Sequence, residues 1–71
     1  MSSTDAVDYL IRVVKENSRG CAAQLAALEA LGEAGGDAAI DCLIAYANDA
    51  SGGSAGHLSS LRAMGRAARQ K

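Results

Sequence analysis

Apolar residues recur at helical spacing at the start of the chain. They are Val7, Leu10, Ile11 and Val14. Side chains three or four positions apart lie on one face of a helix, so this spacing predicts a first amphipathic helix. Ser3 or Thr4 can cap its beginning, because both side chains can accept a hydrogen bond from a free backbone N–H. The polar stretch 17–20 ends it.

The rest of the chain divides into three further helical segments. The second helix is expected over about 21–34, where the glycines at 35–36 stop it, since glycine adopts the left-handed closing conformation freely. Asp37 is expected to cap the third helix, which ends at the turn residues 51–53. A fourth helix is expected over about 54–69, with Ser54 as its cap.

The sequence repeats itself at an offset of 33 residues. Segment 6–11 aligns with 39–44, and segment 25–32 aligns with 58–65. Identical Leu, Ile, Gly and Asp residues stand in both copies, and an alanine-rich composition does not explain them. Short polar turns between helices favour antiparallel hairpins, so we infer a duplicated helical hairpin. The inferred units are repeat 1 at about 4–36 and repeat 2 at about 37–69, within a single domain over 1–71.

Segment 27–35, Ala-Leu-Glu-Ala-Leu-Gly-Glu-Ala-Gly, resembles the second-helix signature of HEAT-like repeats. This is the short bacterial type that also occurs in phycobilin lyases, and segment 61–68 carries a weaker copy. The resemblance covers nearly the whole chain and implies an all-α fold of two tandem HEAT-like hairpins. Glycine costs a helix about 1 kcal/mol relative to alanine, so Gly32 and Gly65 suggest close helix approach. Phycobilin-lyase activity requires much longer arrays and does not carry over.

The faces of the second and fourth helices leave two arrangements open. One stripe of the second helix consists of Ala23, Ala27, Ala30 and Ala34. The leucines lie on another side, at Leu25, Leu28, Leu58 and Leu61. In a compact four-helix arrangement these leucines fill the core, whereas in a short α-solenoid they stay partly uncovered. Two repeats fall below the roughly three that usually bury a continuous core, so we predict self-association through these leucines.

Composition and charge exclude several classes of protein. The 71 residues are 49% hydrophobic and 3% aromatic, with a net charge of −1, which excludes a strongly basic nucleic-acid coat protein and a strongly acidic mimic. No apolar run is long enough to span a membrane, so no membrane partner is expected. The first residues lack a secretory signal, and a cytoplasmic location is expected.

A basic stripe stands in the last predicted helix. Residues 50–71 contain no Asp or Glu, while Arg62, Arg66 and Arg69 lie at i, i+4 and i+7. Cations near a helix C-terminus are favoured by its dipole, which is one explanation. The other is contact with an acidic partner or with phosphate. Trp and Phe are absent, so stacking on bases is poorly supported.

No catalytic or metal-binding constellation emerges. Cys21, Cys42 and His57 are too few soft ligands for a structural metal, so neither metal nor cofactor is expected, and the thiols are interpreted as reduced. His57 and Ser60 could touch, but a catalytic triad also needs an orienting acid and an oxyanion pocket. The glycine-rich segment 52–56 lacks the lysine of a phosphate loop and is interpreted as a turn.

The sequence therefore predicts a non-enzymatic helical protein–protein interaction module that forms homo-oligomers, its other partners unidentified. The alternative is an electrostatic binder of nucleic acid or of an acidic protein through Arg62, Arg66 and Arg69. The salt dependence of binding distinguishes the two, since phosphate contacts release counterions.

Overall fold

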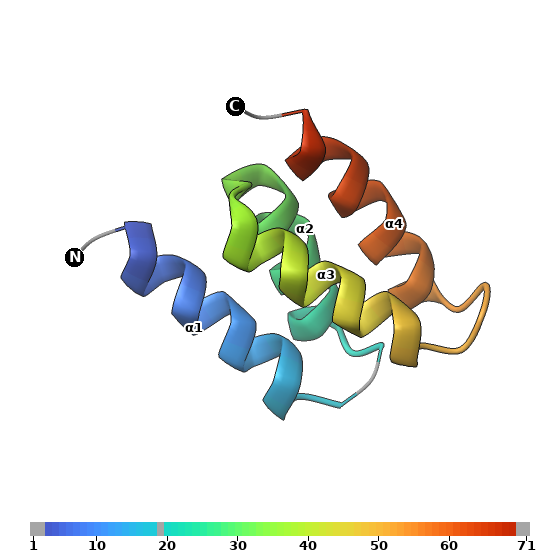
Figure 1. Ribbon diagram of the computed structural model, residues 1–71. Helices are drawn as coiled ribbons and strands as arrows, with labels where there is room; N and C mark the ends of the chain where they lie inside the picture. Colours follow the sequence, from blue (N-terminus) through green and yellow to red (C-terminus); the bar gives the residue numbers. More distant parts are fainter. Residues whose placement is uncertain (1–2, 19, 70–71) are drawn as a thin grey trace.

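The computed structural model describes residues 3–18 and 20–69 (Figure 1). The described residues form four helices and no strand. The helices are α1 (Ser3–Glu16), α2 (Ala22–Ala34), α3 (Asp37–Asp49) and α4 (Ala55–Ala68). The predicted all-α class with four helices is thereby confirmed.

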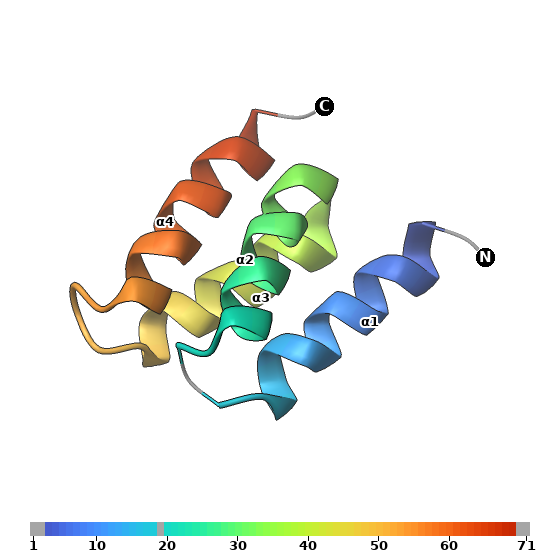
Figure 2. The same ribbon diagram turned by 180° about the vertical axis from the view of Figure 1, so that it is seen from behind.

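The four helices are arranged as two antiparallel hairpins, α1–α2 and α3–α4. Helices α1 and α3 run in one direction, and α2 and α4 run in the other (Figures 1 and 2). The most extensive contact in the fold joins α2 to α4, whereas α1 and α3 touch little. Helix α2 also contacts α1 and α3, so it is the central helix of the fold.

The core is small and rich in alanine. Its buried apolar residues are Val14, Ala27, Leu28, Leu31, Ala39, Leu43, Tyr46, Ala63 and Ala67. Leu28, Leu31 and Leu43 are completely buried. Short alanine side chains let two helices approach closely, which explains how so few large residues can fill the interior.

The two hairpins turn in the same way. Each turn has a glycine with positive φ, 77° at Gly20 and 81° at Gly53. The following residue, Cys21 or Ser54, caps the next helix. Its side chain accepts a hydrogen bond from the backbone N–H three residues later, at 3.4 Å for the Cys21 sulfur and 3.2 Å for the Ser54 hydroxyl. The predicted cap at Ser54 is confirmed.

A side chain in the first turn of each second helix closes the loop. The Gln24 Oε1 atom accepts a hydrogen bond from the Gly20 N–H at 2.8 Å, and the His57 Nδ1 atom accepts one from the Gly53 N–H at 3.1 Å. Gln24 and His57 stand 33 residues apart, so the same hydrogen bond recurs in both hairpins. His57 thus holds a turn in place.

Helix α3 begins without the predicted cap. Gly36, with φ 85°, occupies the N-cap position and has no side chain to accept a hydrogen bond. Asp37 is the first helical residue, so its prediction as the cap was wrong by one position. The left-handed backbone at Gly36 makes the turn one residue earlier. Asp37 still favours the helix, because its carboxylate lies at the positive end of the dipole.

Candidate interaction surface

The four predicted interface leucines have very different surroundings. Leu58 and Leu61 in α4 are 44% and 46% exposed. Leu25 in α2 is half-buried and packs against the core, and Leu28 is completely buried. The expectation that Leu28 lies in an uncovered patch was therefore wrong. Because α2 is the central helix, its neighbours cover the face that carries Leu28.

Equivalent positions of the two hairpins differ in exposure in a systematic way. Leu28 is buried, while Leu61, its counterpart at the 33-residue offset, is 46% exposed. In the same manner Ile11 is half-buried in the groove beside α3, and its counterpart Ile44 is 45% exposed. The side of the first hairpin that contacts the second hairpin thus recurs in the second hairpin, where it is left partly exposed by the residues that the structure describes.

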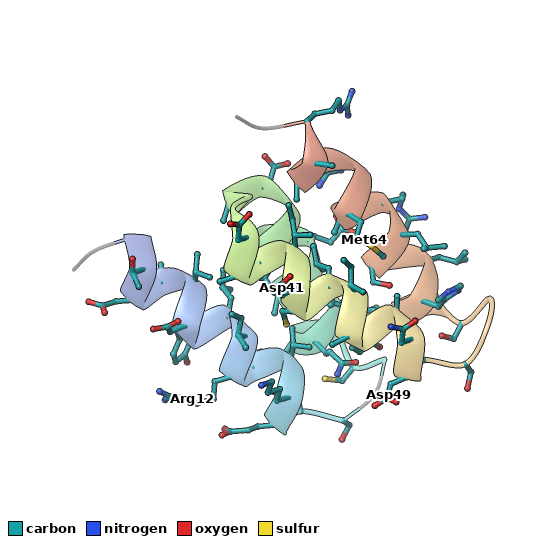
Figure 3. The ribbon with its side chains drawn as sticks, viewed as in Figure 1. Arg12, Asp41, Asp49 and Met64 are labelled. Carbon is teal, nitrogen blue, oxygen red and sulfur yellow. The ribbon has the colours of Figure 1, made fainter. Side chains whose placement is uncertain are left out.

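We call this uncovered side the leucine face. It comprises Ile44, Leu58, Leu61 and Gly65. Leu58, Leu61 and Gly65 lie at i, i+3 and i+7 in α4 and so share one side of that helix. The neighbouring Met64 is half-buried against the core and lies on α4 toward α3 (Figure 3). The leucine face is therefore the outer side of the α3–α4 hairpin.

The opposite side of the molecule carries small residues. Helix α4 carries the buried small residues Gly56, Ser59, Ala63 and Ala67. Ala63 lies against Gly32 of the first hairpin, whereas Gly56 lies against Tyr46 of α3. The α2 counterparts of the four small residues are Ala23, Ala26, Ala30 and Ala34, of which Ala30 is half-buried and the others are exposed. We call these four residues the alanine face. Ala27, predicted in the same stripe, is buried in the core instead.

The predicted arginine stripe is divided by a contact between helices. The Arg66 Nη1 atom lies 3.3 Å from Oε2 of Glu33 and 3.9 Å from Oε1 of Glu29, both in α2. Arg66 therefore bridges α4 to α2, whereas Arg62 and Arg69 are exposed. Partly exposed ion pairs contribute little stability, so the bridge mainly sets which charges face each other across the two helices.

A groove of about 550 Å³ runs between α1 and α3, where these helices separate. Ile11, Val14 and Ala45 provide its apolar walls, and Asp41 and Asp49 of α3 lie along it. Figure 3 shows both aspartates on α3 and Arg12 directed away from that helix. The groove combines an apolar wall with carboxylates.

Cys42 also lines this groove and is half-buried. Burial raises the pKa of the Cys42 thiol, and the positive charge of Lys15 acts in the opposite direction. The thiol is therefore less readily ionised than an ordinary cysteine. Both cysteines are free thiols with a structural environment. Cys42 is partly buried in the groove, and Cys21 caps α2.

Gln24 forms a buried polar network at the end of this groove. Its Nε2 atom donates to the Val14 carbonyl at 2.8 Å, and its Oε1 atom accepts from the Gly20 N–H and, at 3.0 Å, from the Tyr46 hydroxyl. The side chain is only 2% exposed. Gln24 thus joins α1, the first turn, α2 and α3. Sequence reasoning missed this role, and the one available signal was a glutamine among alanines and leucines at the position that matches His57.

Comparisons of the chain with protein-family models, with curated proteins and with solved structures gave no match. Within the described residues, no three side chains of His, Cys, Asp or Glu gather closely enough to hold a metal ion. None of the helices described has both the length and the apolar character needed to cross a bilayer.

Proposed function

We propose that this chain is a small, non-catalytic interaction module that associates with copies of itself in the cytoplasm through the leucine face. One observation carries the proposal: Leu28 is a core residue, and its counterpart Leu61 is 46% exposed in the same kind of helix. Covering large apolar side chains is favourable because it removes them from water. The leucine face therefore has the composition of an interface.

The proposed HEAT-like architecture supports this function. In stacked-repeat proteins each unit buries its apolar sides against its neighbours, and the terminal units usually carry polar outer faces. Helix α4 instead presents Leu58 and Leu61 on its outer side. The exposed leucines favour a further layer of protein on that side.

The proposal is tested by placing charges on the leucine face. We expect wild-type protein to show a mass above the 7.2 kDa of one chain in light scattering. The double variant Leu58→Lys/Leu61→Lys should be a monomer with its helical circular dichroism retained, because both side chains already contact water. Ala45→Lys is the control, since Ala45 is exposed and its counterpart is the exposed Arg12. A monomeric wild type, or a double variant that assembles like the wild type, would contradict the proposal.

A second candidate function is binding of an anionic partner through α4. The observation that favours it is the exposure of Arg62 in α4, a helix without acidic residues, and of Arg69 at its C-cap. Arg66 is engaged with Glu29 and Glu33 and is expected to contribute less. Fluorescence polarisation with duplex DNA at low and physiological salt tests this function. Binding should weaken as salt rises and should be lost in Arg62→Ala/Arg69→Ala. Equal polarisation of the DNA with the wild type and with Arg62→Ala/Arg69→Ala would exclude this second function.

A further inference from the structure

We infer that the association is head-to-tail: the leucine face of one copy receives the alanine face of a second copy. This inference rests on the proposed self-association and specifies its geometry. The contact between α2 and α4 inside the chain serves as its template, because the same residues recur on the two outer sides. The contact between copies would continue the contact within the chain.

The two equivalent glycines of α2 and α4 have different surroundings. A Cβ atom on Gly32 would lie 2.8 Å from the Cα and Cβ atoms of Ala63, so this glycine is needed for the approach of α2 to α4. Gly65, its counterpart, is exposed, and a Cβ there would meet nothing within 4 Å. The counterpart of Ala63 is Ala30, on the alanine face. In a head-to-tail contact, Gly65 of one copy would meet Ala30 of the next.

The leucine face and the alanine face also match in the size of their side chains. Within the chain, the α2 side that carries Leu28 is covered by a second hairpin whose buried small residues include Ser59, Ala63 and Ala67, and Ala63 lies directly against Gly32. The alanine face offers alanines at the counterparts of these three positions, and it is largely exposed. The surface that covers Leu28 within the chain is therefore present again on a second copy, where it is available to cover Leu61.

The charges beside the two faces have opposite signs. Within the chain, Glu29 and Glu33 of α2 face Arg66 of α4. At the 33-residue offset the counterparts of the two glutamates are Arg62 and Arg66, and the counterpart of Arg66 is Glu33. A head-to-tail contact would therefore bring the exposed Arg62 of one copy toward Glu33 of the next, which reverses the signs of the contact within the chain, while Arg66 stays paired with α2 of its own chain. Two leucine faces placed together would bring arginines near arginines, which is unfavourable.

A head-to-tail contact uses a different surface on each copy. Every added copy therefore leaves one leucine face and one alanine face uncovered, and assembly continues unless the chain of copies closes into a ring. A contact between two identical faces would instead stop at a dimer.

Two variants, each blocked on one face, test the inference. Leu61→Lys places a charge on the leucine face. Ala34→Arg places a bulky cation on the alanine face, where Arg62 of the other copy would repel it. Each variant alone should have the 7.2 kDa mass of one chain in light scattering, and an equimolar mixture should give twice that mass and no more. Ala45→Arg, at a position exposed in both hairpins, should assemble like the wild type.

The possible outcomes separate the inference from the proposed function. If Ala34→Arg alone forms dimers, two leucine faces pair with each other, and the inference fails while self-association stands. If the mixture stays monomeric although wild type assembles, the head-to-tail contact is also wrong. A monomeric wild type overturns both. Ala26→Arg, on the same face, replaces Ala34→Arg if circular dichroism shows that the latter has lost its helices.

Gly65→Ala gives an independent test with a minimal change. The added methyl group has open space in one copy, so helix content should be kept or raised. Between copies it should meet Ala30 as a methyl group on Gly32 would meet Ala63, and we expect self-association to weaken about tenfold or more in sedimentation. Unchanged association of this variant would overturn the inference.

Discussion

Gly32 of α2 and Ala63 of α4 lie so close together that no side chain fits between them. A Cβ on Gly32 would stand 2.8 Å from the Cβ of Ala63 and 2.9 Å from its carbonyl oxygen. Since the α2–α4 contact is the most extensive one in the fold, this pair sets the spacing of the two hairpins. Gly65 in α4 is the counterpart of Gly32 at the 33-residue offset, and a Cβ there would meet nothing within 4 Å. The two glycines therefore form a matched pair for experiment.

We predict opposite effects of alanine at the two glycines on the stability of the monomer. Gly32→Ala should lower the free energy of unfolding by about 1–3 kcal/mol, because the methyl group pushes α2 from α4. Gly65→Ala should raise it by about 0.5–1 kcal/mol through helix propensity alone. Urea unfolding in a Leu61→Lys background measures both without self-association. Equal effects at the two positions would show that the close approach at Gly32 does not matter.

Replacing Gln24 should lower the free energy of unfolding more than replacing one of its hydrogen-bond partners does. Gln24→Leu leaves the buried Val14 carbonyl without its partner, at a cost of about 1–3 kcal/mol, and also removes the part-buried hydrogen bond from the Gly20 N–H. Tyr46→Phe removes the hydroxyl that donates to Gln24, and we expect a loss of about 0.5–1.5 kcal/mol. Thermal unfolding of both variants checks the order. A smaller loss for Gln24→Leu than for Tyr46→Phe would contradict the network.

Cys42 should make stability depend on pH in the alkaline range. Burial raises its pKa above the ordinary value of 9.0 in the folded chain, so the thiol ionises first in the unfolded chain. Stability should be fully present below pH 9.0 and should fall as the pH rises through the higher folded pKa. Cys42→Ala should show a smaller fall over that range. Identical pH profiles of chemical unfolding for the two proteins would count against a buried thiol.

Reactivity gives a second measurement of the same thiol. We expect iodoacetamide at pH 8 to modify Cys42 more slowly in the folded chain than in urea. Lys15→Ala should slow it further, because the lysine charge favours the thiolate. Faster modification in Lys15→Ala would show that this charge does not act on Cys42.

The helices could be predicted from local signals, because spacing and capping act within a few residues. The turn before α4 and the cap at Ser54 follow from one short stretch of sequence. Asp37 was misplaced by one position because a left-handed glycine can itself begin a helix without a side-chain cap. Such an error concerns the end of an element and leaves its existence unaffected.

The surface was harder to predict, since it depends on which helix becomes central. Leu28 and Leu61 have the same local sequence pattern, and only the position of α2 between its neighbours makes one buried and the other exposed. In the sequence Arg66 belongs to a stripe of like charges, whereas in the structure it lies beside Glu33 of α2. The network at Gln24 likewise needs three helices to converge.

Sedimentation equilibrium of the wild-type chain tests the central claim most directly. Over a concentration series from micromolar to several hundred micromolar at physiological salt, we expect a weight-average mass that rises steadily above 7.2 kDa. The exposed Leu58 and Leu61 supply the reason, since each added copy covers them. A mass that stays at 7.2 kDa across the whole series would show that the leucine face does not bind a second copy.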